Sequence, residues 1–430
     1  MKSLIAACAM LAAACASVPR DAGLSGLQQE LSQRLPQSIV YEGEMSADAA
    51  VSLAMMHNPR LQATFAELGI ARADLIEAST ISNPLFEAEL RFPGDPYRPY
   101  ELRLAQSLIE LIQLPRRRAA GRAEFDAAKL RITAEIVHFA AEVRARYYDL
   151  IAATQHAAMS RTIYESAQTA AELAQRQHDV QNITDLDLEH EQARYEQAKV
   201  DLSRAEQRLV LARESLLRAI GRGDAAAELR LPAAFPEFRG GAEADQQQLE
   251  QLALSRRLDL EIARREADIA KQRVPLARLA ALGDIEADFH YEREPEGART
   301  FGPGIIVPIP IFNSGRAART RAEAHYLRAR HTLEALLAES SSQIRSARAT
   351  VVEAGARVEY YRDVILPRRQ RIVELTKLEH NAMVTSTYQV LQAVESEAEA
   401  KRDFIEAQHD YWIARNDLDR AVNGVPQGGH

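Results

Sequence analysis

The chain has 430 residues, with 61 acidic and 53 basic side chains and a formal net charge of −8. Aromatic residues make up only 6% of it, whereas alanine, glutamate, arginine, leucine and glutamine are abundant, a composition typical of long helices. The sequence contains no basic patch or nucleic-acid-binding motif, which argues against nucleic acid as a partner.

The N-terminus has the pattern of an export signal. One basic residue precedes an apolar run that is too short for a permanent membrane span. Cys15 follows three alanines, similar to the lipobox at which bacterial lipoproteins are cleaved and lipidated. We therefore expect a signal peptide at 1–14 and a lipidated segment at 15–45, with Ala16 favouring outer-membrane sorting. The alternative is a plain signal peptide that is cleaved at small residues.

The chain then repeats itself. The string RAE at Arg122–Glu124 recurs at Arg321–Glu323, an offset of 321 − 122 = 199 residues. The string LLRAIG at Leu216–Gly221 recurs as LDRAVNG at Leu418–Gly424. An internal repeat of this length indicates a duplicated structural unit. The expected boundaries are a first repeat at 46–221, a linker at 222–248, a second repeat at 249–424 and a tail at 425–430.

The first repeat opens with a predicted helix from about Ser46 to Ser79, which Asn83-Pro84 ends. Apolar and charged residues then alternate, as they do in a strand with one apolar and one charged face. Turn residues at 93–96 separate two such runs, which predicts a β-hairpin over 84–111.

A long helical hairpin is predicted over 116–221. The first arm runs from Arg116 to about His178, on the order of 95 Å at 1.5 Å per residue. Thr184 is a suitable N-cap for a return helix over residues 185–220.

The second repeat has the same plan. A helix over about 246–281 precedes a β-hairpin at 284–311 and a helical hairpin at 316–423. The last strand contains three prolines, so we expect part of it to be irregular.

These elements indicate assembly with other copies. Four strands are too few to close a membrane barrel, since the smallest have about eight and open edges are not tolerated in lipid. No apolar run of the mature chain reaches the ~20 residues that a spanning helix needs. Either several chains pool their strands in a membrane, or each hairpin is a soluble flap on a helical bundle. Such a hairpin is marginally stable alone in water, and the export signal favours the membrane.

The charged faces of the strands predict the lining of a lumen. The candidates are Glu87, Glu89, Arg91, Glu101, Arg103, Glu286, Asp288, His290 and Glu292. Charge rings of this kind bias ion passage, so we expect a mild cation preference; the alternative is a solvated interior without selectivity. The sequence has no metal-ligand spacing, phosphate loop or serine elbow, so no cofactor, metal site or enzymatic activity is expected.

Three motifs, in this order, resemble the TolC-like outer-membrane efflux proteins. They are HNPRLQATFAELGIARADL at His57–Leu75, VPIPIFNSGRAARTRAEA at Val307–Ala324 and VILPRRQRIVEL at Val364–Leu375. The segment LIELIQLPRRR at Leu108–Arg118 is similar to the heavy-metal-efflux branch of that family.

The resemblance implies a mainly α fold with a small β part. Three copies would join their long helical hairpins in an α-barrel and their four strands each in a twelve-stranded transmembrane β-barrel. The implied function is a passive channel through the outer membrane lipid and the periplasm, exporting small molecules or metal ions. The implied partners are two further copies, a periplasmic adaptor (a membrane fusion protein) and an inner-membrane pump of the RND type. Alternatives are a type I secretion duct and a soluble periplasmic coiled-coil scaffold.

The tips of the helical hairpins depart from the family pattern. The segments VQNITDLDL at Val180–Leu188 and NAMVTSTYQVL at Asn381–Leu391 contain no glycine. The resemblance places the gate and the adaptor contact at these tips, where the candidates are Thr184, Asp185, Asp187, Thr387, Tyr388 and Gln389. An acidic ring is expected only from the two aspartates, which are alternatively first-turn acids favoured by the helix dipole.

Overall fold

A computed structural model describes residues 24–35, 44–90, 92, 100–221, 230–238, 245–280, 283–294, 297–309, 311 and 314–424. The predictions for the signal peptide, Cys15, Arg91 and the tail 425–430 lie outside these residues. The chain forms two compact units. Unit 1 comprises Met1–Glu30, Ala63–Ala134 and Leu258–Glu339; unit 2 comprises Leu31–Gln62, Glu135–Arg257 and Ser340–His430.

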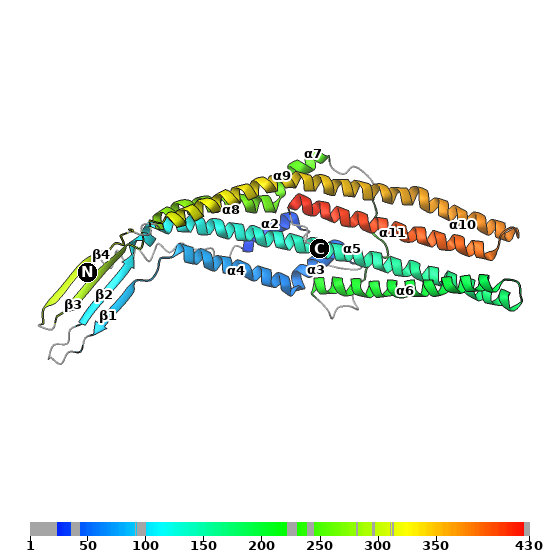
Figure 1. Cartoon of the computed structure of the whole chain (residues 1–430), viewed down its shortest axis with the longest axis horizontal. Coiled ribbons are helices and arrows are strands. Elements are labelled where there is room, and N and C mark those ends of the chain that lie inside the picture. Colours follow the sequence, from blue (N-terminus) through cyan, green and yellow to red (C-terminus); the bar gives the residue numbers. More distant parts are fainter. Residues whose placement is uncertain are drawn as a thin grey trace. The chain divides into compact units, whose positions relative to one another are not determined.

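Unit 1 contains one antiparallel sheet with the strand order β1-β2-β3-β4 (Figure 1). The strands are β1 Leu85–Leu90, β2 Tyr100–Ser107, β3 Glu286–Arg293 and β4 Arg299–Ile306. The two predicted hairpins therefore lie edge to edge, joined by the pairing of β2 with β3. Strand β4 ends before Pro308, which agrees with the expected irregularity of this proline-rich run.

The helices follow the order of the two repeats. Those that begin before the first tip are α3 Ala47–His57, α4 Pro59–Ser79 and α5 Leu108–Asp179; α6 Asp185–Ile220 returns. The second repeat has α7 Gln246–Arg256, α8 Leu258–Ala280, α9 Arg316–Tyr360, α10 Leu366–Asn381 and α11 Thr387–Asn423. Among the described residues, no helix is both long and apolar enough to cross a membrane.

Helix α5 begins earlier than predicted. Leu108 donates its backbone N–H to the Ile285 carbonyl (2.7 Å), and the helix starts at that residue. The prediction that strand structure extends to 111 and the helix begins at Arg116 is therefore wrong. The physical reason is that Leu108, Ile109 and Ile112 have helical rather than alternating spacing. Pro115 is accommodated inside the helix.

The first helix of each repeat is in fact two helices. A single helix over about 46–79 was expected, but Asn58 separates α3 from α4 with extended backbone (ψ 119°). Pro59 explains this break, because the residue before proline disfavours the α region. The predicted helix 246–281 is likewise interrupted, at Arg257 (ψ 116°). These two positions are related by the repeat offset, since 257 − 58 = 199.

The residue at each break is hydrogen-bonded to the C-terminal end of the helix that returns from the tip. The Asn58 Nδ2 atom donates to the Ala219 carbonyl (2.6 Å), and the Arg257 Nη1 atom donates to the Ala421 carbonyl (3.0 Å). Both side chains are buried. The last carbonyls of a helix lack partners within it, so the two breaks satisfy α6 and α11 in the same way. Gly221 and Gly424 then end these helices with positive φ.

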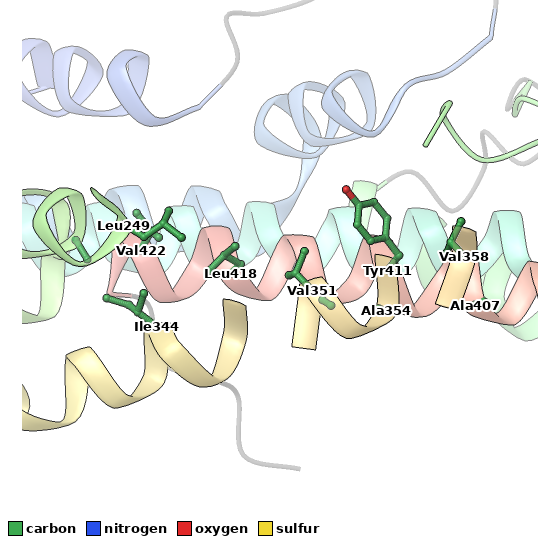
Figure 2. Close-up of a cluster of buried hydrophobic side chains, with 11 residues drawn as sticks. Leu249, Ile344, Val351, Ala354, Val358, Ala407, Tyr411, Leu418 and Val422 are labelled. Carbon is green, nitrogen blue, oxygen red and sulfur yellow. The ribbon is translucent and has the colours of Figure 1, made fainter. Parts of the chain in front are cut away.

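The second repeat has a core of its own inside unit 2. Side chains from α7, α9 and α11 pack together in a cluster of small and branched apolar residues around Tyr411 (Figure 2). Gly355 allows this approach, because a Cβ atom there would lie 3.6 Å from both Phe238 and Tyr411. The ring of Phe238 meets that of Tyr411 edge-on at 4.7 Å between centroids. Alanine and glycine thus let long helices pack closely.

A π-helical turn interrupts the outgoing arm of the second hairpin at Tyr361–Ile365. It ends two residues before Pro367, whose missing N–H cannot continue an α-helical ladder. No such turn is assigned in α5. The offset between repeats grows over this stretch, from 199 residues at Arg122 to 418 − 216 = 202 at Leu216. The outgoing arm of the second hairpin is therefore three residues longer than that of the first, and the π turn lies within this longer arm.

No helix was predicted within the segment expected at 15–45, but α2 spans Leu24–Arg34. Leu27, Leu31 and Leu35 are buried and recur at helical spacing. This spacing is the signal that the sequence analysis missed.

Candidate functional site

The strand register places the predicted lumen residues on one face of the sheet. Side chains alternate between faces along each strand, so residues opposite each other across the sheet share a face. Glu87 is opposite Arg103, which is opposite His290; Ala105 is opposite Asp288. The eight described candidates all fall on this face: Glu87, Glu89, Glu101, Arg103, Glu286, Asp288, His290 and Glu292.

Arg103 is the centre of an ion-pair network on this face. Its Nε atom lies 3.4 Å from an Asp288 oxygen, and its Nη1 atom lies 3.9 Å from a Glu87 oxygen. Gly304 opposes Asp288 and leaves room for it, because a Cβ atom on Gly304 would lie 2.4 Å from the carboxylate. Arg103 thus balances a carboxylate on each of its two neighbouring strands.

The row that contains Glu89 carries three acids and no base among the described residues. Glu89 on β1, Glu101 on β2 and Glu292 on β3 lie directly opposite one another, with Thr300 completing the row on β4. Side chains directly opposite on neighbouring strands have Cβ atoms about 4.5–5.5 Å apart, at which distance like charges repel. This row is where the expected cation preference would arise.

Unit 1 also contains a cavity of about 640 Å³ between α4, α5, α8 and α9. Alanines line much of it, and two ion pairs stand at its wall. Arg131 of α5 contacts Glu266 of α8 (2.8 Å), and Arg273 of α8 contacts Glu124 of α5 (2.7 Å). These cross-repeat pairs were not among the predicted site residues.

At the first tip, the structure gives the predicted residues capping roles. Thr184 is the N-cap of α6, as predicted. Its Oγ1 accepts from the Asp187 N–H (3.2 Å), and the Thr184 N–H donates to the Asp187 carboxylate (3.2 Å), which completes a capping box; Oγ1 also donates to that carboxylate (2.7 Å). These hydrogen bonds from Thr184 lower the pKa of Asp187 below its ordinary value. Asp185 pairs with His178 (2.7 Å).

The second tip has the same backbone with different side chains. Ser386 is the N-cap of α11 and accepts from the Gln389 N–H, and Thr387 is the first helical residue. Each outgoing helix ends in a Schellman motif, with Gln181 and Met383 at φ 59°. Glycine usually occupies this left-handed position. Both tips therefore have the left-handed backbone conformation that glycine usually adopts, with Gln181 and Met383 in its place.

Two side-chain contacts join the hairpins near their tips. The Tyr388 hydroxyl donates to Gln177 Oε1 on α5 (2.8 Å). Arg194 of α6 forms an ion pair with Glu395 of α11 and a second with Glu191 of its own helix. Tyr388 was a predicted site residue, whereas Gln177, Arg194 and Glu395 were not.

A histidine link between the repeats predicts a dependence of stability on pH. His409 of α11 contacts Asp149 of α5 through Nε2 (2.7 Å). Burial would lower the pKa of His409, but the hydrogen bond to Asp149 and the charges of Asp149 and Asp410 outweigh it and raise this pKa. A raised pKa in the folded state means that the stabilisation is complete below the unfolded pKa. It is lost as pH rises through the folded pKa.

We therefore expect His409→Gln to destabilise the protein by about 1–2 kcal/mol near pH 5 and by much less near pH 8. Thermal unfolding followed by circular dichroism at the two pH values measures this difference. His331→Gln is the control, since His331 is exposed on α9 and contacts only Glu334 of its own helix among the described residues. Equal losses for His409→Gln at both pH values would contradict the expectation.

Comparisons with known proteins agree with this architecture. Residues 249–424 match the family model described as outer membrane efflux protein. A membrane protein from Pseudomonas aeruginosa superposes with a TM-score of 0.72 at 20% identity, covering 90% of this chain and 98% of that chain. The Campylobacter jejuni CmeC outer membrane channel gives 0.73 at 15% identity, covering 92% and 91%. The open-state MtrE outer membrane channel from Neisseria gonorrhoeae gives 0.69 at 17% identity, covering 91% and 96%.

A comparison of the sequence with curated proteins found no significant match. The family model covers the second repeat, and the solved channels share the fold of both repeats. The resemblance seen in the motifs thus agrees with a match of residues 249–424 to the outer membrane efflux protein model and with a fold shared with solved outer membrane channels.

Proposed function

We propose that the chain is the outer-membrane channel subunit of a tripartite efflux system. It would act as a passive duct without a catalytic step, exporting small molecules or metal ions that an inner-membrane pump delivers through a periplasmic adaptor. The family match and the shared channel fold support this proposal.

The observation that carries it is the two-faced sheet. Phe86, Leu104 and Phe289 form one row of the apolar face, and they are 64%, 50% and 48% exposed in the single chain. The opposite face holds the charged row and the Arg103 network. Such a sheet suits lipid on one side and water on the other.

The same sheet supports a homotrimer. Its outer strands, β1 and β4, each pair with only one neighbour among the described residues. Backbone groups at such edges must be paired in lipid. Three copies that join β1 to β4 would satisfy every edge and close a twelve-stranded barrel.

Membrane fractionation and mass measurement test the proposal. We expect the protein in the outer membrane, and a detergent-solubilised particle with the mass of three chains. Recovery only in the soluble periplasm would favour the coiled-coil scaffold instead. A Cys15→Ser variant tests lipidation separately: it should lose labelling by radioactive palmitate but keep the trimer. A type I secretion duct would instead lose polypeptide export, rather than resistance to small molecules, when its gene is deleted.

The acid row predicts the ion selectivity of the duct. We expect Glu101→Gln/Glu292→Gln to lower the cation preference several-fold, because two of three carboxylates in each row lose their charge. Reversal potentials in planar bilayers under a salt gradient measure this change. Glu67→Gln, in α4 outside the sheet, is the control. Anion selectivity in the wild type that the double variant leaves unchanged would contradict the expectation.

A further inference from the structure

We propose that the cavity in unit 1 binds a small amphiphilic organic anion. Its acidic group contacts Arg321, His325 and Arg328 of α9, and its apolar part lies against the alanines of the wall. The proposal goes beyond the duct function, because a passive duct needs no bound ligand. It depends neither on the faces of the sheet nor on the number of copies.

The first observation is the size and the lining of the cavity. Its volume of about 640 Å³ is within the ~300–1,000 Å³ that is usual for small-molecule sites. Alanines from all four helices line it, together with Phe125 and Ile269. Such a wall accepts an apolar group without needing a hydrogen bond. The few charged side chains of the lining therefore determine how a bound molecule is oriented.

The second observation is an excess of positive charge in the lining. Four arginines line the cavity, against Asp74 and two glutamates. The cross-repeat ion pairs described above use Arg131 and Arg273 together with both glutamates. Among the residues that the structure describes, neither Arg321 nor Arg328 forms an ion pair with an acid. These two arginines are therefore available to an anionic ligand.

The third observation comes from the equivalent positions in the first repeat. There Asp126 forms an ion pair with Lys129 (2.7 Å). At the repeat offset, 325 − 126 = 199, the corresponding residues are His325 and Arg328. The second repeat thus has the base but not the acid that pairs with it. The residue at position 325 therefore leaves the charge of Arg328 unbalanced.

His325 also brings the donors of the two arginines together. The Arg328 Nη2 atom lies 3.3 Å from His325 Nδ1. Arginine has no acceptor, so Nδ1 accepts this hydrogen bond and the proton of the neutral ring is on Nε2. His325 is the i+4 neighbour of Arg321, and side chains with this spacing lie next to each other on a helix. An acidic group beside His325 is therefore within reach of N–H donors from three side chains, two of which are charged.

Fluorescence titration of the full chain in lipid nanodiscs with dansylglycine, an aromatic carboxylate, tests the site; empty nanodiscs give the background. We expect Arg321→Gln/Arg328→Gln to weaken binding by about tenfold, equivalent to about 1.4 kcal/mol. Arg319→Gln/Arg330→Gln is the matched control. It removes the same charge from α9 at positions that do not line the cavity, and it should bind as the wild type does.

Two further measurements separate charge from shape. Ala322→Leu narrows the cavity without changing its charge, so it should also weaken binding, and it tests the site even if the arginine variant does not fold. Dansylamide, the uncharged analogue, should bind to the wild type about tenfold more weakly than dansylglycine.

Three results would overturn the site: equal affinities of the wild type and the Arg321/Arg328 variant, an equal loss in the Arg319/Arg330 control, and equal affinities for dansylamide and dansylglycine. A wild type that reaches the outer membrane as a trimer but shows no saturable binding overturns the site and leaves the duct function standing.

Discussion

Reversing the charge of Arg194 is expected to open the tip of the channel, and reversing Glu395 as well is expected to close it again. Arg194 and Glu395 join the two helical hairpins, and their side chains are 35% and 23% exposed. An ion pair of this exposure contributes about 1 kcal/mol, so Arg194→Glu should raise the ratio of open to closed channels by roughly five- to tenfold. Single-channel recording in planar bilayers measures the open fraction directly.

The double variant Arg194→Glu/Glu395→Arg tests the pair rather than either residue. It restores opposite charges across the same gap, so its open fraction should return toward that of the wild type. Arg161→Glu is the matched control, because the pair Arg161–Glu206 joins α5 to α6 within one hairpin. An Arg161→Glu channel that opens as readily as Arg194→Glu would show that the effect is a general loosening of the helices.

Tyr388 provides a second contact between the same hairpins. Its hydroxyl donates to Gln177, and Tyr388→Phe removes that hydrogen bond while keeping the ring. The net contribution of such a bond is about 1 kcal/mol. Tyr388 and Glu395 are seven residues apart on α11, so the two changes should be additive in free energy if each contact forms independently in the closed state, and less than additive if losing one contact also loosens the other.

The tip shows what the sequence could and could not predict. Thr184 was identifiable as an N-cap because a threonine before a first-turn acid is a local signal. Arg194 was not identifiable, because its local neighbour Glu191 already gives it an ordinary helix-surface pair. Its partner Glu395 is distant in sequence and belongs to the other repeat. Long-range pairs of this kind leave no mark in the periodicity of either helix.

The two faces of the sheet, by contrast, were predictable because they leave a local pattern in the sequence. Strict alternation over two hairpins determines which side chains share a face, so the candidate lumen residues could be assigned without knowing the pairing. What alternation cannot provide is the register between β2 and β3. That register alone brings Glu101 opposite Glu292 and creates the acid row.

The helix breaks show a further limit. The break at Asn58 has a local cause in Pro59, which the prediction passed over. The break at Arg257 has none, because Leu258 is an ordinary helix residue. It is identifiable only through the repeat, as the equivalent of Asn58. The buried hydrogen bond from Arg257 to the end of α11 supplies the stabilisation that local sequence does not.

Gly221→Ala is expected to destabilise the protein by about 2–4 kcal/mol. Gly221 has φ 82°, and a Cβ atom there would lie 2.7 Å from the Asn58 Cα atom and 2.8 Å from the His57 carbonyl oxygen. Both contacts are with backbone, so α6 and the break at Asn58 must move apart. That movement would also lengthen or break the hydrogen bond from Asn58 to Ala219. The buried Ala219 carbonyl would then lose its donor.

Gly69→Ala is the matched control for this substitution. Gly69 lies inside α4 with open space around its Cα atom, so alanine should leave stability unchanged or raise it by up to about 1 kcal/mol. Unfolding of both variants, followed by circular dichroism in the same detergent, gives the comparison. If Gly221→Ala were as stable as Gly69→Ala, the contact between α6 and the first break would not be a fixed part of the fold. Of the two equivalent contacts between a returning helix and a break, only that between α11 and Arg257 would then remain as a fixed part of the fold.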